Sequence, residues 1–442
     1  MPELEIAEIE KQLNACFGAR ELDRCGRQNG LELRRHRGIP TSGLVCSLLT
    51  TLGSRRVETL ADLHRDFQSL QQSTVYYKPF YEKLDRPGFG RVMKSVFERV
   101  LGLLSPRVLG PAQTSPLSGF DDVVLHDGTS VGLHEELRRA FPSRFTKLHP
   151  AGAELHVTMS LWQQAPLKVQ IAPDKEGERQ FLPSPEALRN KLLLADRGYD
   201  GLSYLSEVDR AGGFFAVRIR SIANPIVERV LSGTRRLRRQ VGRPLKEALA
   251  HASKSQCSDL IVTFPARGGR AACTFRLFVQ KQRQRKKDRK RPDPWLRIVT
   301  NVGQDRLSAL QVRQVYRLRW QIELFFKELK SHANLRPFCT RKKAIAEGLF
   351  WASLCAAALK RYFAHACQLN RQSAAISPRR VALCAHAFLA TILCLVQTRS
   401  RRLRLALERA FAFLAVSARR SNPTRERKSG LLTLDLVPRG VP

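Results

Sequence analysis

Acidic residues are scarce in this sequence of 442 residues. It has 39 Asp and Glu against 76 Lys and Arg, which gives a formal net charge of +37. Such an imbalance produces self-repulsion unless a polyanion neutralises it. A small domain needs a net charge of only roughly 2 to 8 to stay in solution. The excess therefore indicates a nucleic-acid partner more strongly than a merely soluble basic protein.

Cysteine motifs are missing as well. The ten cysteines are scattered along the chain, and no two of them form a C-x-x-C pair. No group of Cys and His has zinc-finger spacing. Several cysteines lie inside apolar runs, where they act as small buried side chains. These patterns argue against a structural zinc site or a disulfide framework, and they favour a reducing, intracellular compartment.

Neither a signal peptide nor a clear membrane span is evident. The first residues, MPELEIAEIEKQLN, are acidic and polar, unlike a secretion signal. The run Val381–Gln397 is apolar over 17 residues, near the lower limit for crossing a bilayer. It contains His386 and has arginines on both sides. A buried helix within a helical bundle is therefore favoured over a membrane span.

The length of the chain suggests about three domains. The pattern of apolar and charged residues divides the chain into five parts. Residues 1–118 show the three-to-four spacing of apolar residues that is typical of helices, and TLADLHRDF followed by QQSTVYYKPFYEKL could form a helix-turn-helix, so we expect a helical DNA-binding region there. Residues 119–221 alternate short strands with helices, the pattern of an α/β protein. Residues 222–301 contain paired strands and a basic run, so we expect an inserted β-rich segment there. Helices return in residues 302–340, and residues 341–442 contain apolar helices and a basic tail.

Two apolar runs are each followed by an aspartate. Asp127 follows VVLH and opens DGTS, whereas Asp196 follows LLLA and opens RGYD. A carboxylate at the end of a buried strand is held rigidly at the sheet edge, and two such residues on adjacent strands can share one site. Close like charges raise the pKa of one of them unless cations lie between. Taken singly, either aspartate is equally typical of a turn or a helix cap.

A third carboxylate lies in YRLRWQIELFFKELK, which predicts one continuous helix over Tyr316–Lys330. At about 100° per residue, three other polar residues fall within roughly 40° of Glu323: Tyr316, Arg319 and Lys330. A separate apolar stripe explains how this helix docks. Glu323 alone could pair with basic neighbours on its own helix, for only a few tenths of a kcal/mol. Together, three carboxylates without a Cys or His partner favour Mg²⁺ or Mn²⁺ over Zn²⁺.

These motifs resemble the signature of the DDE transposases named after insertion sequence four, which includes the spacing Y-x₂-R-x₃-E-x₆-K. The resemblance implies an α/β fold with an RNase H-like catalytic core, interrupted by a β-rich insertion and joined to helical N-terminal and C-terminal regions. The 127 positions from Asp196 to Glu323 leave room for that insertion. It also implies that Asp127, Asp196 and Glu323 are catalytic and hold two ions of Mg²⁺ or Mn²⁺.

The resemblance further implies contacts with DNA. Arg319 and Lys330 should contact phosphates beside the scissile bond, and Tyr316 should hydrogen-bond a phosphate next to them. Trp295 matches by position a tryptophan that stacks on a flipped base in relatives, an interaction worth about 1–3 kcal/mol. Simple packing against its strand is an equal alternative for Trp295. His126 should face away from Asp127 and pack on the other side of its strand.

The expected function is two-metal-ion cleavage and strand transfer at the ends of an insertion sequence. The expected partners are double-stranded DNA, as element ends and as target, and a second copy of the chain that contacts the C-terminal helices. The expected location is the bacterial cytoplasm, on the nucleoid and not on a membrane. One alternative, a metal-dependent nuclease, has no need to hold an end through several steps. Another, a catalytically inactive DNA-binding protein, gains nothing from clustered carboxylates that repel DNA.

Overall fold

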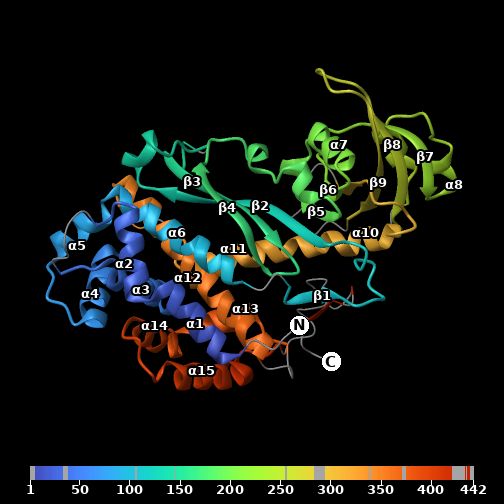
Figure 1. Cartoon of the computed structure of the whole chain (residues 1–442). Coiled ribbons are helices and arrows are strands. Elements are labelled where there is room, and N and C mark those ends of the chain that lie inside the picture. The colour runs from blue at the N-terminus through green and yellow to red at the C-terminus, as the bar shows by residue number, and fades with distance from the viewer. Residues whose placement is uncertain are drawn as a thin grey trace.

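The computed structural model describes residues 5–32, 38–104, 107–144, 146–253, 256–282, 294–336, 338, 340–370, 375–420, 434 and 436–438. The basic run of the predicted insertion and the basic C-terminal tail lie largely outside these residues. A large twisted sheet covers one side of a body of helices, and the last strands of the sheet extend to one end of the molecule (Figure 1).

Helices from both ends of the chain form a single body. The N-terminal helices are α1 (Ile6–Phe17), α2 (Ala19–Gln28), α3 (Thr41–Ser54), α4 (Leu60–Gln71), α5 (Tyr77–Leu84) and α6 (Pro87–Leu103). The C-terminal helices are α12 (Lys343–Asn370), α13 (Pro378–Cys384), α14 (Leu389–Gln397) and α15 (Leu403–Ser417). Helix α12 packs against α3 and α6, and α15 packs against α1, so the two ends interleave (Figure 1). One continuous apolar core joins them.

The apolar run Val381–Gln397 is not one helix. It spans most of α13 and all of α14, which are separated by a short 3-10 helix at Ala385–Ala387. Among the described residues, no single helix has the length and apolarity to cross a membrane. The stretches Pro378–Ala387 and Leu389–Gln397 pass that test only as a pair, and they are bent by 68°. The prediction of a single helix was wrong, because the chain bends between Ala387 and Leu389.

The sheet has nine strands in the order β4-β3-β2-β5-β6-β10-β9-β8-β7. Their bounds are β2 (Asp122–Leu133), β3 (Ala151–Ser160), β4 (Ala165–Pro173), β5 (Lys191–Ala195), β6 (Phe214–Arg218), β7 (Ile226–Ser232), β8 (Ser258–Phe264), β9 (Cys273–Lys281) and β10 (Trp295–Thr300). Strand β5 runs parallel to both β2 and β6, and every other pair in the sheet is antiparallel. A separate short pair joins β1 (Leu109–Pro111) to β11 (Leu436–Pro438). The predicted α/β class is confirmed.

Strands β7 to β10 continue the main sheet. Strand β10 pairs with β6, and β9, β8 and β7 follow as an antiparallel series. Two short helices, α8 (Arg235–Arg238) and α9 (Leu245–Ala248), connect β7 to β8. The β-rich texture of residues 222–301 therefore extends the existing sheet along its hydrogen-bonding direction.

Side chains of the central strands alternate between two apolar layers, because successive residues of a strand point to opposite faces. Leu192 and Leu194 of β5 join the layer that holds the helical body, whereas Leu193 and Ala195 join a second layer. Helices α10 (Ala309–Tyr316) and α11 (Trp320–His332) run beneath β2, β5 and β6 (Figure 1). Helix α7 (Leu202–Arg210) covers the second face.

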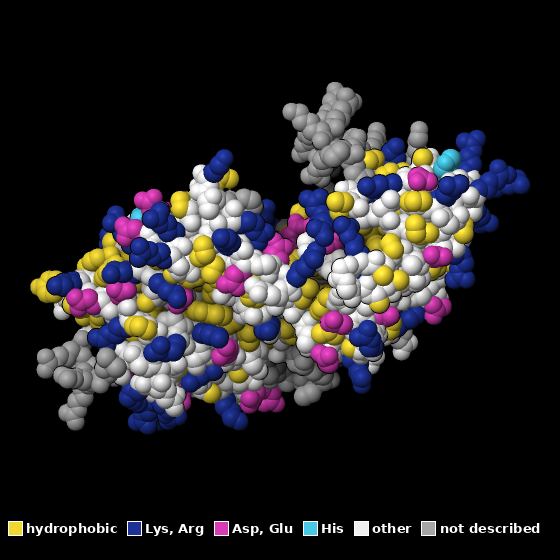
Figure 2. Space-filling model, turned by 90° about the horizontal axis from the view of Figure 1, so that it is seen from above, with side chains coloured by type: hydrophobic (Ala, Val, Ile, Leu, Met, Phe, Trp, Pro, Cys, Tyr) yellow, Lys and Arg dark blue, Asp and Glu magenta, His cyan; other side chains and the backbone are white. Residues whose placement is uncertain are grey.

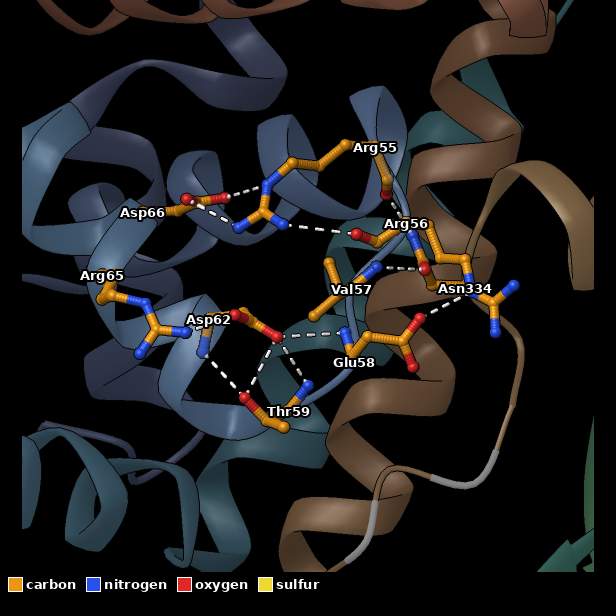
Figure 3. A network of polar contacts seen from close by, with 9 residues as sticks. All are labelled: Arg55, Arg56, Val57, Glu58, Thr59, Asp62, Arg65, Asp66 and Asn334. Atoms are coloured by element: carbon orange, nitrogen blue, oxygen red, sulfur yellow. Dashed lines mark hydrogen bonds and ion pairs between the residues drawn. The ribbon is translucent and has the colours of Figure 1, made fainter.

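The C-terminal end of α11 is tied to the N-terminal helices by Asn334. Its side chain accepts a hydrogen bond from the Val57 amide at 2.9 Å and donates to the Arg55 carbonyl (Figure 3). It also donates to the Leu52 carbonyl. The segment that carries Arg55 and Val57 leads into α4. There Thr59 and Asp62 form a capping box, in which each side chain accepts a hydrogen bond from the other residue's backbone amide. This network fixes where α11 ends, and therefore where its polar face lies relative to the sheet.

Candidate active site

Asp127 lies inside a strand. The prediction that its strand ends at Asp127 was wrong, because β2 continues to Leu133 by antiparallel pairing with β3. The parallel pairing with β5 does stop here, at His126 opposite Ala195. Alternation places Asp127 on the face of the sheet that carries the helices. Its side chain is 20% exposed at the point where the neighbouring strand has ended.

Asp196 follows β5 directly, as the sequence predicts. It has extended backbone angles, and it precedes a short 3-10 helix, Arg197–Tyr199. Because β2 and β5 are adjacent and parallel, the pairing of His126 with Ala195 puts Asp196 level with Asp127. The two aspartates therefore come from neighbouring strands and share one face of the sheet.

The stretch Tyr316–Lys330 is helical but not one helix. Helix α10 ends at Tyr316, a 3-10 turn covers Arg317–Arg319, and α11 begins at Trp320. The prediction of a continuous helix was therefore wrong in detail. Glu323 lies in the first turn of α11, where a negative charge is favoured by the helix dipole. Buried Ile322, Phe325 and Leu329 dock α11 onto the apolar layer.

Arg319 connects two of the carboxylates. Its Nη1 donates to Asp127 Oδ2 at 3.1 Å, and its Nη2 donates to Glu323 Oε1. The hydroxyl of Tyr316 donates to Asp196 Oδ1 at 3.2 Å. The structure thus brings the three predicted carboxylates to one place, and each accepts a hydrogen bond from a residue of the Tyr316–Lys330 motif.

Burial controls the electrostatics of these groups. It raises the pKa of Asp127 to about 6; Arg319 opposes this increase, and the nearby Asp196 and Glu323 add to it. Burial also raises the pKa of Tyr316, and the adjacent carboxylate of Asp196 raises it further. The Tyr316 hydroxyl therefore stays protonated and remains a hydrogen-bond donor.

The chemistry of the donor set suits a hard divalent cation, because it consists of carboxylate oxygens alone. Nevertheless, in the part of the chain that the structure describes, no three His, Cys, Asp or Glu side chains form a ready metal site. The guanidinium of Arg319 is the cation that binds Asp127 and Glu323. It stands in for a metal ion in neutralising them.

Lys330 and Trp295 lie further from the carboxylates. The Lys330 ammonium donates to the Ser130 carbonyl of β2 at 3.3 Å, and partial burial lowers its pKa. Trp295 begins β10 and packs against the second apolar layer, with the Lys281 ammonium 6.0 Å from its ring centre. The pairing of β10 with β6 places Trp295 three residues beyond the level of Asp196, roughly 10 Å along the strand. The structure does not bring Trp295 into contact with the carboxylates.

His126 lies on the opposite face, as predicted. It is fully buried, shares a hydrogen bond with the Thr158 hydroxyl at 2.9 Å, and meets the Tyr199 ring edge-on at 4.9 Å. Burial lowers the pKa of His126 to about 3, so the ring is neutral.

A buried polar cluster on the face of the sheet opposite Asp127 was not predicted from the sequence. Strand β3 places Glu154 and His156 opposite Ser130 and Gly128 of β2, and both side chains are buried. Arg144 pairs with Glu154 at 2.9 Å, and burial raises the pKa of Glu154 to about 7. A Cβ on Gly128 would lie 2.5 Å from the Glu154 carboxylate, which explains the glycine of DGTS. The alternating polar residues of β3 were the available signal.

Two arginines that bind Asp200, four residues after Asp196, were also not predicted from the sequence. Asp200 is buried and accepts hydrogen bonds from Arg179 at 2.8 Å and from Arg220 at 2.9 Å. Both arginine side chains remain about half exposed. Lys and Arg side chains gather beside a notch near the middle of the face in Figure 2, and acidic side chains lie within it. The two half-exposed arginines therefore place positive charge at the surface next to Asp200.

Three comparisons relate this chain to known proteins. The profile of the family described as "Transposase DDE domain" matches residues 118–359, more than half of the chain. The transposase of insertion sequence element IS1151 from Clostridium perfringens is 24% identical over 243 residues, 48% of this chain and 50% of the relative. The transposase of IS231B from Bacillus thuringiensis subsp. berliner is 22% identical over 244 residues, 49% and 51% of the two chains.

A shorter and closer match is the putative transposase InsL of IS186A from Escherichia coli (strain K12). It is 44% identical over 62 residues, 14% of this chain and 17% of the relative. Among solved structures, a piggyBac transposase synaptic complex with hairpin DNA aligns with a TM-score of 0.45 and 9% identity, over 94% of this chain and 86% of that one. The chain spans about half the length of the first two of these relatives.

Proposed function

This chain belongs to the family of transposase DDE domains, and on that premise we propose that it is a DNA transposase. The proposed reaction is metal-dependent phosphodiester cleavage at the ends of an insertion sequence, followed by strand transfer into target DNA. The observation that carries the proposal is the convergence of Asp127, Asp196 and Glu323, which come from two strands and a helix. We assign an RNase H-like core to the strands from β2 to β6 with α11, and an insertion to residues 222–301.

Asp127, Asp196 and Glu323 are the proposed ligands of two divalent ions, Mg²⁺ or Mn²⁺. Such ions, when bound, activate the attacking oxygen and stabilise the leaving oxygen of a phosphodiester. The rigid strands hold two of the ligands, and the polar face of α11 holds the third. No covalent protein–DNA intermediate is needed, so a Ser or Tyr nucleophile has no part in the reaction.

The remaining motif residues are proposed to position DNA. Arg319 and Lys330 would contact phosphates next to the scissile bond, and the protonated Tyr316 would hydrogen-bond another. Trp295, at the start of β10, would stack on a base displaced from the duplex end. The half-exposed Arg179 and Arg220 would extend the phosphate contact along the rim beside Asp196.

We further propose that the chain acts as a homodimer on two DNA ends, in the cytoplasm of a bacterium and on its nucleoid. The C-terminal helices offer a surface for that contact, because Leu405, Phe413 and Val416 of α15 are exposed apolar residues. Light scattering with end DNA should show two chains in each complex. A single chain on each duplex would contradict the dimer.

The central experiment incubates the full chain and Mg²⁺ with the DNA that flanks its own gene. The unmodified chain should cut this DNA at defined positions and join the new 3′ ends to a second duplex. Asp196→Asn and Glu323→Gln should each abolish both products. Glu207→Gln is the matched control, since it removes one charge from an exposed position on α7. Cleavage that survives Asp196→Asn would remove this residue from the site.

The same assay separates the alternatives. Cutting without joining would indicate a metal-dependent nuclease. Binding without cutting, in the presence of either Mg²⁺ or Mn²⁺, would indicate a catalytically inactive DNA-binding protein.

A further inference from the structure

We propose that Arg319 is the resident countercation of the carboxylate site, and that divalent ions enter the site when Arg319 leaves it for a DNA phosphate. DNA and metal ions would then bind cooperatively, because DNA draws the guanidinium away from the carboxylates and metal ions take the place of the guanidinium on the carboxylates. This inference rests on the proposed function in so far as the polyanion is DNA.

The three carboxylates already have hydrogen-bond donors from within the chain. Arg319 donates to Asp127 at 3.1 Å and to Glu323, and the Gly128 amide donates to the other oxygen of Asp127 at 2.9 Å. Tyr316 donates to Asp196. A Mg²⁺ ion would need the same oxygen lone pairs at about 2.0–2.1 Å. A guanidinium in hydrogen-bond contact and a metal ion cannot share that space, so binding of one excludes the other.

Arg319 can leave Asp127 and Glu323 without breaking other hydrogen bonds that the described residues make with its side chain. Within the described part of the chain, its guanidinium donates only to carboxylates, through two of its nitrogens. Its side chain is 14% exposed, and the next residue, Trp320, is half exposed. The Arg319 side chain is therefore mostly covered but retains a path to solvent. Arginine forms a charge-assisted, often bidentate pair with phosphate, so a DNA backbone can replace the two carboxylates as its partner.

The charges of the site also favour this exchange. Three carboxylates in one place repel each other unless a cation neutralises them. Without DNA, Arg319 supplies that cation from within the protein. When DNA arrives, the phosphate takes Arg319 and leaves the carboxylates without a countercation, which raises their affinity for divalent ions. Binding free energies are reciprocal, so divalent ions must increase the affinity for DNA by the same factor.

The experiment measures Mn²⁺ binding to the full chain without DNA, from the electron paramagnetic resonance signal of the free ion. Arg319→Gln should bind Mn²⁺ at least about tenfold more tightly than the unmodified chain, which corresponds to about 1.4 kcal/mol. Arg313→Gln is the matched control, because it removes one positive charge from an exposed position on α10. Adding Glu323→Gln to Arg319→Gln should remove the gain and so locate the bound ion.

A second set of titrations adds a duplex from the DNA flanking the gene, with the Mn²⁺ bound by DNA alone subtracted. The duplex should raise the Mn²⁺ affinity of the unmodified chain and leave that of Arg319→Gln unchanged. Arg319→Lys keeps the charge but loses the planar fork, and it should give an intermediate affinity. Circular dichroism checks that each variant is folded.

Equal Mn²⁺ affinities for the unmodified chain and Arg319→Gln without DNA would overturn the inference. An equal gain in Arg313→Gln would overturn it too, since net charge alone would then explain the effect. The readout is bound Mn²⁺ and not cleaved DNA. A chain that shows the exchange but never cuts DNA would therefore refute the proposed function and leave this inference in place.

Discussion

Two arginines of this fold meet carboxylates in opposite ways. In the β7–β10 half of the sheet, Arg276 donates to both oxygens of Asp259, and its Nη1 donates to the carbonyls of Val302 and Leu307. Gln304 donates to the same aspartate at 2.6 Å. Both members of this pair are almost completely buried. Near Asp127, Arg319 has only carboxylate partners among the described residues, and solvent reaches it.

The difference separates a structural arginine from an exchangeable one. Arg276 holds β9 to the segment that leads into α10, which begins just after Leu307 and is followed by α11. Every contact of Arg276 lies within the folded chain. Arg319 instead faces a site whose proposed ligands and substrates come from outside. The same pair of charges therefore fixes the fold in one region and stays available for binding in the other.

Removing the two arginines should have very different effects on stability. Arg276→Met leaves Asp259 buried without its partner, and breaking such a pair costs about 3–5 kcal/mol. Arg319→Met should cost less than Arg276→Met, because the side chains of Asp127 and Glu323 are 20% and 30% exposed and regain part of their hydration. Unfolding in guanidinium chloride, without metal ions, measures both values. Equal losses would show that Arg319 is as much a part of the fold as Arg276.

Asp127 and Asp259, the acidic partners of the two arginines, should affect the stability of the fold in opposite directions when ionised. Burial raises the pKa of Asp127 from near 4 to about 6, so the folded chain binds this proton more tightly than the unfolded chain. The contribution of Asp127 to stability therefore falls as the pH rises from 4 through 6. Above pH 6 the ionised side chain destabilises the metal-free fold by up to about 3 kcal/mol.

Asp127→Asn should therefore raise the melting temperature in EDTA at pH 8 and leave it nearly unchanged at pH 4. Asp259→Asn should lower the melting temperature at pH 8, because it leaves Arg276 buried without a countercharge. Thermal unfolding of the two variants at both pH values tests the contrast. A lower melting temperature for Asp127→Asn at pH 8 would mean that its pairing with Arg319 outweighs the cost of burial.

Much of the candidate site was predictable because its signals are local. An apolar run followed by Asp196 predicts a strand end, and the spacing from Tyr316 to Lys330 predicts a shared polar face. The prediction failed where tertiary pairing overrides local chemistry. DGTS is typical of a turn, yet β3 pairs with it and continues the strand past Asp127.

The partners of the carboxylates were not predictable from spacing. Helical geometry places Arg319 beside Glu323, but the bond to Asp127 depends on how α11 docks against β2. The cluster of Glu154 and His156 was hidden for the same reason, since only the register of β3 puts it behind Gly128. The α/β class followed from the alternation of elements. That β10 extends the central sheet from β6 did not follow from any local pattern.

Trp295 lies in the β7–β10 half of the sheet, and DNA-binding measurements test its proposed role. If its ring stacks on a displaced base, Trp295→Ala should weaken binding of end DNA by about 1–3 kcal/mol, or roughly five-fold to a hundred-fold. Trp295→Phe keeps an aromatic face and should recover most of that loss. Fluorescence anisotropy with duplexes from the flanking DNA gives the affinities. If Trp295→Ala lowers only the melting temperature, the ring serves to pack against the second apolar layer.

Lys330 should give the smallest effect, because its contact is a single point charge at the edge of the site. Its ammonium lies 3.3 Å from the Ser130 carbonyl, close to β2, and a phosphate there would gain one ionic contact. Lys330→Ala should lower the affinity for duplex DNA by a few-fold and reduce the slope of log K against log salt concentration by about 0.9. Lys327→Ala removes the same charge from an exposed position one turn earlier on α11 and should leave the slope unchanged if that face is remote from DNA. Equal changes in both variants would mean that DNA senses the net charge of the helix, and that Lys330 makes no specific contact.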